Sequence, residues 1–496
     1  MRTVILYFLV CLLGSTSAAQ AISFSEVTSA EGKGEAFNFD RTMSDYFDAL
    51  AGKRLDKARK ATAAVRENAP NPRLGQALAQ LLEAPIAAAQ NKDDKARDLL
   101  AAGEAASPDT PELLGLTLPA FLYVERADFA GTTVDRMIAR APDLVRGLEP
   151  DLVYLLLDDT GEAQSVLDDR RIALAELNFG GADGDYLASS AVGVLMKRDQ
   201  IARALKILPD IDSPRHVENL LILRRFAPLW PALAAQAGPG LSRSRESSVR
   251  LARQEYEADV SDPRKLAALF TALRYARRYP ELWALKEKLP ATPKEMAKAD
   301  EQMGWAVNEM ALALHQDNRG DEADRLFASL NDSLPANDWR VSMFINRTAL
   351  LMADGKFAEA LPLIERAEKE PKSPFAAQLL RRWRYCALVR LSRATEAAAL
   401  RTEMMKNADA AKAATVEGLL CAGEVDEAEK LALGFLADDD FQKDFVRSLQ
   451  RKRLTDVEQT AWGNWTALRS RPAISAAFEK YGRDLPDDLL ISEGTN

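Results

Sequence analysis

The chain has 496 residues, of which 47% are hydrophobic and 28% are charged, and its formal net charge at pH 7 is −9. A modest acidic excess favours solubility and argues against nucleic acid as a partner, because phosphate binding relies on clustered basic residues. Three cysteines cannot form a disulfide framework for a chain of this length, so its stability has to come from packing.

The first stretch, MRTVILYFLVCLLGSTSAAQA, has the pattern of a secretory signal peptide. Arg2 precedes an apolar run from Val4 to Leu13, and small residues follow up to Ala21. About ten apolar residues at ~1.5 Å each cover only about half of a ~30 Å hydrocarbon core. We therefore expect residues 1–21 to be cleaved and the chain to be secreted to the periplasm, with no membrane span in the mature chain.

The rest of the chain is rich in alanine and leucine, and no Asn-Gly or Asp-Gly turn lies between alternating apolar runs. This composition predicts an all-α protein. A flexible leader, 22–40, is expected before the first helix.

One stretch, MADGKFAEALPLIERAEKEP (352–371), indicates a helical hairpin with a one-glycine turn. Ala360 is followed on the same helix face by Ile364 and Ala367, and Pro371 ends the second helix. The same pattern begins at alanines 58, 96, 130 and 323, and weaker copies begin at alanines 163, 204, 397 and 428. The spacings of 34 to 38 residues between neighbouring strong copies fit two ~12-residue helices and two short turns.

These residues resemble the tetratricopeptide repeat family, most closely where Phe344, Leu351, Gly355 and Ala360 follow one another. The resemblance covers most of residues 40–440 and implies a right-handed superhelical solenoid of stacked hairpins. Two features depart from the family pattern: its early aromatic residue is mostly missing, and Pro362 lies inside a second helix.

The chain is expected to divide into two arrays of helical repeats, 41–236 and 249–440. Between 205 and 300 the pattern fades and cannot be phased. The stretch 237–248 contains Gly-Pro-Gly, a sequence that interrupts helices, followed by serines and arginines. It is expected to be a linker or hinge between the arrays, and the alternative is a long loop. Residues 441–483 are expected to form capping helices over the last repeat, or alternatively a docking pair for a partner, and 484–496 to form a tail.

Groups for catalysis are sparse. The two histidines, His216 and His315, lie about a hundred residues apart, and no zinc, phosphate-loop or nucleophile-elbow motif occurs. We expect no catalytic residue, no cofactor and no metal. The enzyme alternative is a hydrolase with a site between repeats, which would require Asp210, Asp212 and His216 to converge with another titratable group in one cleft.

Residues 215–278 hold twelve arginines and lysines against six acidic residues. Arginine forks bind carboxylates and phosphates through paired hydrogen bonds, so this segment is a candidate site for an anion such as an envelope polysaccharide. The alternative is that these arginines pair with acidic turns of adjacent repeats. The candidate anion-binding residues are Arg224, Arg225, Arg277 and Arg278.

Cys386 and Cys421 fall in the first helices of neighbouring repeats. A disulfide requires Cα atoms within ~7 Å, whereas stacked helices usually lie ~8–10 Å apart. Two buried free thiols are therefore expected, and a disulfide stays open as the alternative in an oxidising compartment.

In the tetratricopeptide family the first helices line the inner, concave surface, which usually grips the ligand. Inner positions in this chain are mostly apolar or small, which suits an apolar peptide segment or helix as the partner. A tight coil that buries them is the alternative. The resemblance thus implies a non-catalytic interaction scaffold of the cell envelope, with a protein or peptide partner held by Phe47, Leu81, Asn308, Leu312, His315, Ile345 and Met352.

Overall fold

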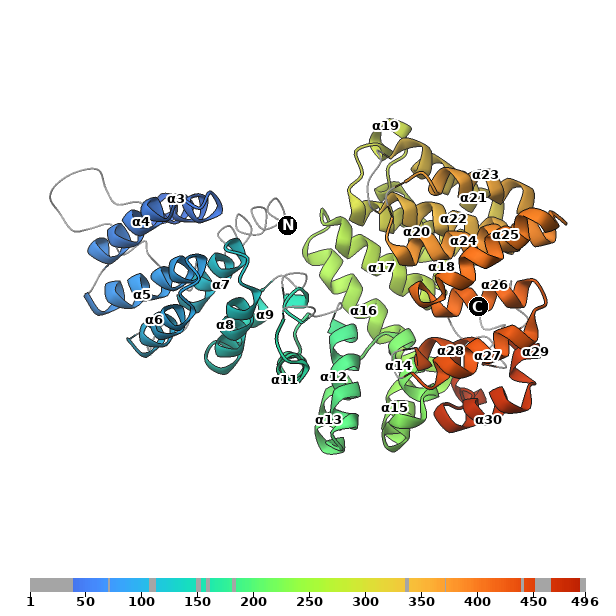
Figure 1. The fold of residues 1–496 in the computed structure, drawn as a ribbon, viewed down its shortest axis with the longest axis horizontal. Coiled ribbons are helices and arrows are strands. Elements are labelled where there is room, and N and C mark those ends of the chain that lie inside the picture. Colours follow the sequence, from blue (N-terminus) through green and yellow to red (C-terminus); the bar gives the residue numbers. More distant parts are fainter. Residues whose placement is uncertain are drawn as a thin grey trace. The chain divides into compact units, whose positions relative to one another are not determined.

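The computed structural model contains helices throughout its described part and no β-strand there (Figure 1). This confirms the expected all-α class. The chain forms two compact units, unit 1 up to Arg198 and unit 2 from Asp199 onward. The described residues are 39–69, 72–106, 113–148, 153–157, 161–180, 184–334, 339–370, 372–438, 441–450 and 465–490. The predicted signal peptide and most of the leader lie outside them.

Unit 1 consists of helices that pack in consecutive pairs, α3 with α4, α5 with α6, α7 with α8, and α11 with α12. Its helices are α3 (Phe39–Ala51), α4 (Leu55–Asn68), α5 (Pro72–Ala89), α6 (Asp93–Ala106), α7 (Leu114–Tyr123), α8 (Ala127–Arg140), α9 (Pro142–Arg146), α11 (Gln164–Glu176) and α12 (Asp185–Lys197).

Unit 2 begins with short helices and continues with longer hairpins. The first part comprises α13 (Ile201–Ile207), η4 (Leu208–Asp210), α14 (Pro214–Ile222), η5 (Arg224–Leu229), α15 (Trp230–Ala237), η6 (Pro239–Leu241), α16 (Ser242–Ala258), α17 (Pro263–Tyr275), α18 (Tyr279–Ala284), η7 (Lys286–Lys288) and α19 (Pro293–Met296). The hairpins are α20 (Glu301–Gln316) with α21 (Gly320–Ser333), α22 (Arg340–Ala353) with α23 (Phe357–Ala367), α24 (Pro374–Arg390) with α25 (Ala394–Lys406), and α26 (Lys412–Cys421) with α27 (Val425–Leu436). The last elements are η8 (Ala408–Ala410), which precedes α26, and then α28 (Gln442–Ser448), α29 (Trp465–Arg469), α30 (Pro472–Tyr481) and η9 (Asp487–Leu489).

Many of the turns that join two paired helices have one repeated geometry. One residue adopts a positive φ, and the next amide donates back across the end of the first helix, as Lys356 N does to Leu351 O at 2.8 Å. This is a helix C-terminal motif that satisfies carbonyls otherwise left without a donor. Among the described residues, eight turns that lead directly into the second helix show both features, with the positive φ at Lys53, Asn91, Glu125, Arg277, Asn318, Gly355, Ser392 and Gly423.

Five residues after these turns lies a buried small or apolar residue of the second helix. At seven of these eight turns it is an alanine that the repeat pattern predicts: Ala58, Ala96, Ala130, Ala323, Ala360, Ala397 and Ala428. After Arg277 it is Leu282, which phases one hairpin in the stretch where the sequence pattern fades. Ala204, another alanine of the pattern, is buried and lies five residues after the positive-φ residue Asp199. A small side chain at this place lets the second helix approach the first closely.

Ala163 does not belong to this series. It is exposed and directly precedes α11, so it lies outside a helix crossing, and its assignment as a repeat copy is wrong. Pro362 does lie inside a second helix, and α23 continues past it to Ala367.

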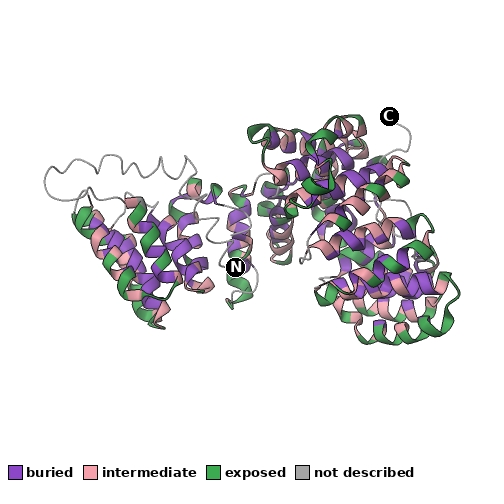
Figure 2. Cartoon of the chain, turned by 90° about the horizontal axis from the view of Figure 1, so that it is seen from above, coloured by how far each residue is buried: buried purple, intermediate pink, exposed green. Residues whose placement is uncertain are grey.

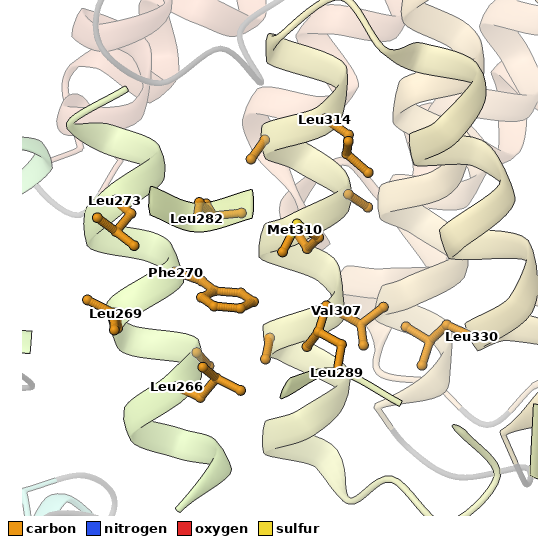
Figure 3. Packing of buried hydrophobic residues seen from close by; sticks show 14 of the residues in the cluster. Leu266, Leu269, Phe270, Leu273, Leu282, Leu289, Val307, Met310, Leu314 and Leu330 are labelled. Atoms are coloured by element: carbon orange, nitrogen blue, oxygen red, sulfur yellow. The ribbon is translucent and has the colours of Figure 1, made fainter. Parts of the chain in front are cut away.

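The apolar faces of the hairpins meet in the interior of each unit, as the buried residues in Figure 2 show. In the middle of unit 2, Phe270 of α17 points toward Met310 of α20, and Leu266 and Val307 belong to the same cluster of buried residues (Figure 3). Such stacking supplies the cover that a single hairpin cannot give its own apolar face.

Replacing Ala360 with leucine should destabilise unit 2 by about 1–3 kcal/mol, because three heavy atoms would enter a fully buried helix contact. Urea denaturation measures this cost. Ala358, two residues earlier on the same helix, is exposed, so Ala358→Leu should change stability by less than about 0.5 kcal/mol. A larger effect at Ala358 than at Ala360 would show that the phasing of α23 is wrong.

The end of unit 2 packs against its beginning. Helix α28 contacts α14, α30 contacts η5, and η9 contacts η6. Arg447 donates to Glu218 over 3.3 Å, and both side chains are buried although they are 229 residues apart in the chain. Arg483 donates to the carbonyls of Leu221 and Ile222, beside an isolated bridge between Leu223 and Gly482. The described part of the expected cap therefore contacts the N-terminal elements α14 and η5 of unit 2 as well as α27.

Two expected boundaries differ from the structure. The compact units divide at residue 198, whereas 237–248 lies inside unit 2 and contains η6 and the start of α16. Residues 484–490 of the expected tail are anchored, since Leu485 and Leu489 are buried and Leu485 N donates to Gln450 Oε1. Leu489 lies in η9, and η9 contacts η6. This contact joins distant parts of the chain, so no local sequence pattern predicts it.

Candidate functional site

The seven residues predicted for a concave binding face lie mostly in the core. Only His315 keeps appreciable exposure, with about a fifth of its side chain accessible. In unit 2, first helices of neighbouring hairpins contact each other directly, α17 with α20, α22 with α24, and α24 with α26. The other six residues are buried, so they contribute to packing and offer no accessible contact surface. They are Phe47, Leu81, Asn308, Leu312, Ile345 and Met352.

Polar pairs join neighbouring first helices of unit 2. Arg274 Nε of α17 donates to Glu309 Oε2 of α20 at 2.7 Å, and Arg382 of α24 pairs with Glu417 of α26. The partners in each pair are 35 residues apart, so each pair links one repeat to the next.

A hydrogen bond of the same kind joins α20 to α22. Asn346 Nδ2 donates to Asn308 Oδ1 at 2.8 Å, and Asn308 in turn donates to Glu309. Buried polar groups need partners, because an unpaired one costs ~1–3 kcal/mol. These contacts fix the stacking of the first helices and were missed by the sequence reasoning, since neither residue of a pair belongs to the alanine pattern.

His315 lies at the turn edge of unit 2. Its Nε2 is 2.9 Å from Asp354 Oδ1, and Asp354 Oδ2 lies 3.5 Å from Lys356 Nζ. Lys356 also pairs with Asp321 of the preceding hairpin. The histidine thus belongs to a network of ion pairs that links two turns.

The four predicted anion-binding arginines do not share one environment. Arg224 is exposed and donates to the carbonyl of Glu479 at 3.0 Å, and the guanidinium of Arg225 lies over the ring of Phe226. Arg278 pairs with Glu281 and with Glu246, the latter at 3.1 Å. For Arg278 the structure favours the alternative that basic residues pair with acidic residues of neighbouring elements.

Among the described residues, no ion pair or hydrogen bond joins Arg277 or Arg245 to a carboxylate, although the charge of Glu246 acts on Arg245. The ion pair between Glu246 and Arg278 places the start of α16 against the turn after α17, so the two arginines lie in adjacent positions of the contact. The Nε of Arg245 is buried without a hydrogen-bond acceptor among the described residues. Burial, and then the charge of Arg277, lower the pKa of Arg245.

Asp210, Asp212 and His216 do not gather in one cleft. Asp212 lines a hollow of about 410 Å³ together with Arg243, Ser244 and Ser247, and neither Asp210 nor His216 lines it. Burial, with a smaller contribution from Asp212, raises the pKa of Asp210. The cations Arg215, Lys443 and Arg447 lie close enough to His216 to act on its charge.

Burial and these cations lower the pKa of His216 from 6.5 to about 4. Below pH 6.5 the unfolded chain therefore binds a proton that the folded chain does not, and unit 2 should lose about 3 kcal/mol of stability as the pH falls from 6.5 to 4. Urea denaturation at pH 7, 6, 5 and 4 measures this loss. His216→Gln should show a flatter dependence over this range, and an unchanged slope would contradict the assignment.

Unit 1 contains a buried charge cluster that the sequence reasoning also missed. Arg170 has a fully buried side chain that donates twice to Asp135, at 2.7 and 2.9 Å, and twice to Glu162, at 2.8 and 2.9 Å. A Cβ on Gly131 would lie 2.6 Å from this guanidinium, so glycine is required there for space. The cluster joins α8, α11 and the segment before α11.

Cys386 and Cys421 are both buried and free. They lie on α24 and α26, next to the buried pair of Arg382 and Glu417. This confirms the expected pair of buried free thiols. Burial raises the pKa of the Cys386 thiol.

No family model matches the chain, and no curated protein is significantly similar to it. The tetratricopeptide resemblance accordingly stays a prediction. Within the described ranges, no helix is long and apolar enough to cross a membrane, and no three His, Cys, Asp or Glu side chains are arranged to hold a metal ion.

Proposed function

We propose that the chain is a tetratricopeptide-like repeat protein, built as a right-handed solenoid, that works as a non-catalytic interaction scaffold of the cell envelope. The observation that carries this proposal is the repeated hairpin, in which a positive-φ turn is followed five residues later by a buried small or apolar residue. Proteins built from such units expose extended surfaces, and binding is their general use. The assignment to a scaffold rests on the family resemblance, because a fold alone does not define a function.

Residues that remain accessible on the first helices are the contacts proposed for a protein or peptide partner. On α22, Ser342 and Ala349 are half-buried and Ala353 is exposed, and all three share a helix face with Ile345 and Met352. The buried members of this face support the accessible ones.

A photo-crosslinking amino acid in place of Ala353 tests this proposal in the native cell. Ala358, equally exposed but on the second helix α23, is the matched control position. The proposal expects a specific protein adduct, identified by mass spectrometry, from position 353 and little from position 358. Adducts from neither position, or from 358 alone, would contradict a scaffold that uses its first helices.

A second candidate function, anion binding by the basic segment, rests on Arg245 and Arg277. Two neighbouring guanidinium groups without a carboxylate partner in the described chain would both gain from one bridging carboxylate or sulfate group. Arg278 and Arg253 do not contribute free charge, because Glu281 and Glu246 neutralise them.

Calorimetric titration with a uronic acid oligosaccharide tests the second candidate. The double variant Arg245→Met with Arg277→Met should lose at least tenfold in affinity. Arg250→Met is the control, because Arg250 is exposed on the same helix as Arg245 and donates hydrogen bonds to the neutral side chains of Gln254 and Ser247. An equal loss in the control, or no binding by the unaltered chain, would rule out a specific arginine site.

A further inference from the structure

The hollow of about 410 Å³ in unit 2 lies between elements that follow one another in the chain. Its wall is formed by α13, η4, the segment after η4, α15 and α16. Four aliphatic and five polar residues line it, and none of the nine is aromatic. Arg245 and Arg277 do not line it, so the hollow is separate from the basic pair described above. Its volume falls in the range of ~300–1,000 Å³ that is usual for small-molecule sites.

Ser244 of α16 is the lining residue that points to a ligand. It is 1% exposed, and its Oγ has no hydrogen-bond partner among the described residues. A buried hydroxyl without a partner costs free energy, and most buried polar groups in folded proteins are hydrogen-bonded. Because Ser244 lines the hollow, a polar ligand bound there would supply the missing partner.

Two other polar side chains of the wall are held in place by backbone carbonyls. Gln236 Nε2 donates to the carbonyls of Leu208 and Ile211, each at 2.9 Å. Both hydrogens of this amide are thereby used, which leaves Gln236 Oε1 as an acceptor. Arg243 Nη1 donates to the carbonyl of Ala235 at 3.0 Å, and the other N–H groups of the guanidinium make no hydrogen bond within the described ranges. The wall therefore offers an oriented acceptor and an oriented donor.

The wall also carries charges of both signs beside apolar surface. Asp212 contributes a carboxylate and Arg243 a guanidinium. Leu205, another lining residue, is a large hydrophobic side chain that is 41% exposed. A zwitterion with aliphatic side chains would match all three. A nucleobase would lack the aromatic ring on which bases usually stack.

We propose that this hollow binds a short zwitterionic peptide of two aliphatic residues, such as Ala-Leu. The peptide carboxylate accepts hydrogen bonds from Arg243 and from Ser244 Oγ, and its ammonium group donates to Asp212 and to Gln236 Oε1. Its aliphatic side chains pack against Leu205. At the ~30 Å³ of one water molecule, the hollow has room for about fourteen water-sized groups, which is the size of a dipeptide and exceeds a single amino acid.

Calorimetric titration of the full chain with Ala-Leu tests the proposal. Ser244→Ala removes one oxygen atom and should weaken binding at least fivefold, because the peptide carboxylate loses a hydrogen bond. The same variant should unfold at the urea concentration of the unaltered protein, since the hydroxyl has no partner there before the peptide binds. Ser248→Ala is the control, because Ser248 is half-buried on the same helix but does not line the hollow.

A second pair of variants fills the hollow from its edge. Ala232 is an exposed lining residue of α15, so Ala232→Leu should weaken binding at least tenfold. Ala235, equally exposed on α15, does not line the hollow, and Ala235→Leu should bind as the unaltered chain does. Urea denaturation shows whether both variants are folded.

A capped peptide tests the recognition of charge. N-acetyl-Ala-Leu amide has neither the ammonium group nor the carboxylate, so it should bind at least tenfold more weakly than Ala-Leu. The proposal would be overturned by equal binding of the capped peptide or by the absence of Ala-Leu binding at millimolar concentration. Unchanged affinity in Ser244→Ala or in folded Ala232→Leu would equally overturn it.

Discussion

Replacing Glu218 with alanine should lower the free energy of unfolding of unit 2 by about 3–5 kcal/mol. The side chains of Glu218 and Arg447 are 1% and 6% exposed, so the variant would leave a buried guanidinium without its carboxylate. Asn219 Oδ1, at 3.2 Å from Arg447 Nη1, offers only a neutral acceptor. The loss should appear in urea denaturation followed by tryptophan fluorescence.

Two comparisons separate this effect from a general sensitivity of the chain. Glu257→Ala removes an exposed carboxylate of α16 and should cost less than about 0.5 kcal/mol. The double variant Glu218→Ala with Arg447→Met should recover part of the loss, because it removes both buried charges together. A cost below about 1 kcal/mol for Glu218→Ala alone would mean that this contact does not hold the two ends of unit 2 together.

Replacing Arg170 with methionine should destabilise unit 1 by about 3–5 kcal/mol. The change leaves two carboxylates, Asp135 and Glu162, facing each other without the guanidinium between them. Although burial alone lowers the pKa of Arg170, its hydrogen bonds to Glu162 and Asp135 outweigh burial and raise it, so the arginine stays charged. Denaturation monitored by circular dichroism measures the loss.

The control for Arg170 is Arg97→Met in the same unit. Arg97 and its partner Asp94 are largely exposed, and exposed ion pairs contribute about 0–1 kcal/mol. Equal costs at Arg170 and Arg97 would contradict a stabilising role for the buried cluster.

The repeat could be predicted from sequence because its requirements are local. A small residue such as Ala360 must lie where two helices cross, and a turn such as Gly355 must come five residues earlier, so both leave a pattern within one hairpin. The pattern does not identify the hairpin in which Leu282 occupies the position of the alanine. It also predicts a repeat at Ala163, an exposed alanine that does not lie at a helix crossing. In an alanine-rich chain, residue type alone does not distinguish these two cases.

The candidate site could be predicted only in part, because accessibility depends on how neighbouring hairpins stack. Ile345 and Met352 lie on α22, the first helix of its hairpin, yet both are buried in the stacked unit. The contact of Arg447 with Glu218 joins residues 229 positions apart, and no periodicity within a repeat contains that information. The same holds for the two thiols, whose separation depends on the offset between α24 and α26.

The central claim is that the molecule is built from one repeated hairpin, each copy of which depends on its neighbours. Hydrogen exchange followed by mass spectrometry tests this claim most directly when the unaltered chain is compared with Ala360→Leu. Because each repeat contacts chiefly the adjacent ones, exchange should accelerate mainly between residues 320 and 400, and residues 50–140 should stay as protected as before. Unchanged exchange around α22 and α23, or equal acceleration across both units, would contradict the account.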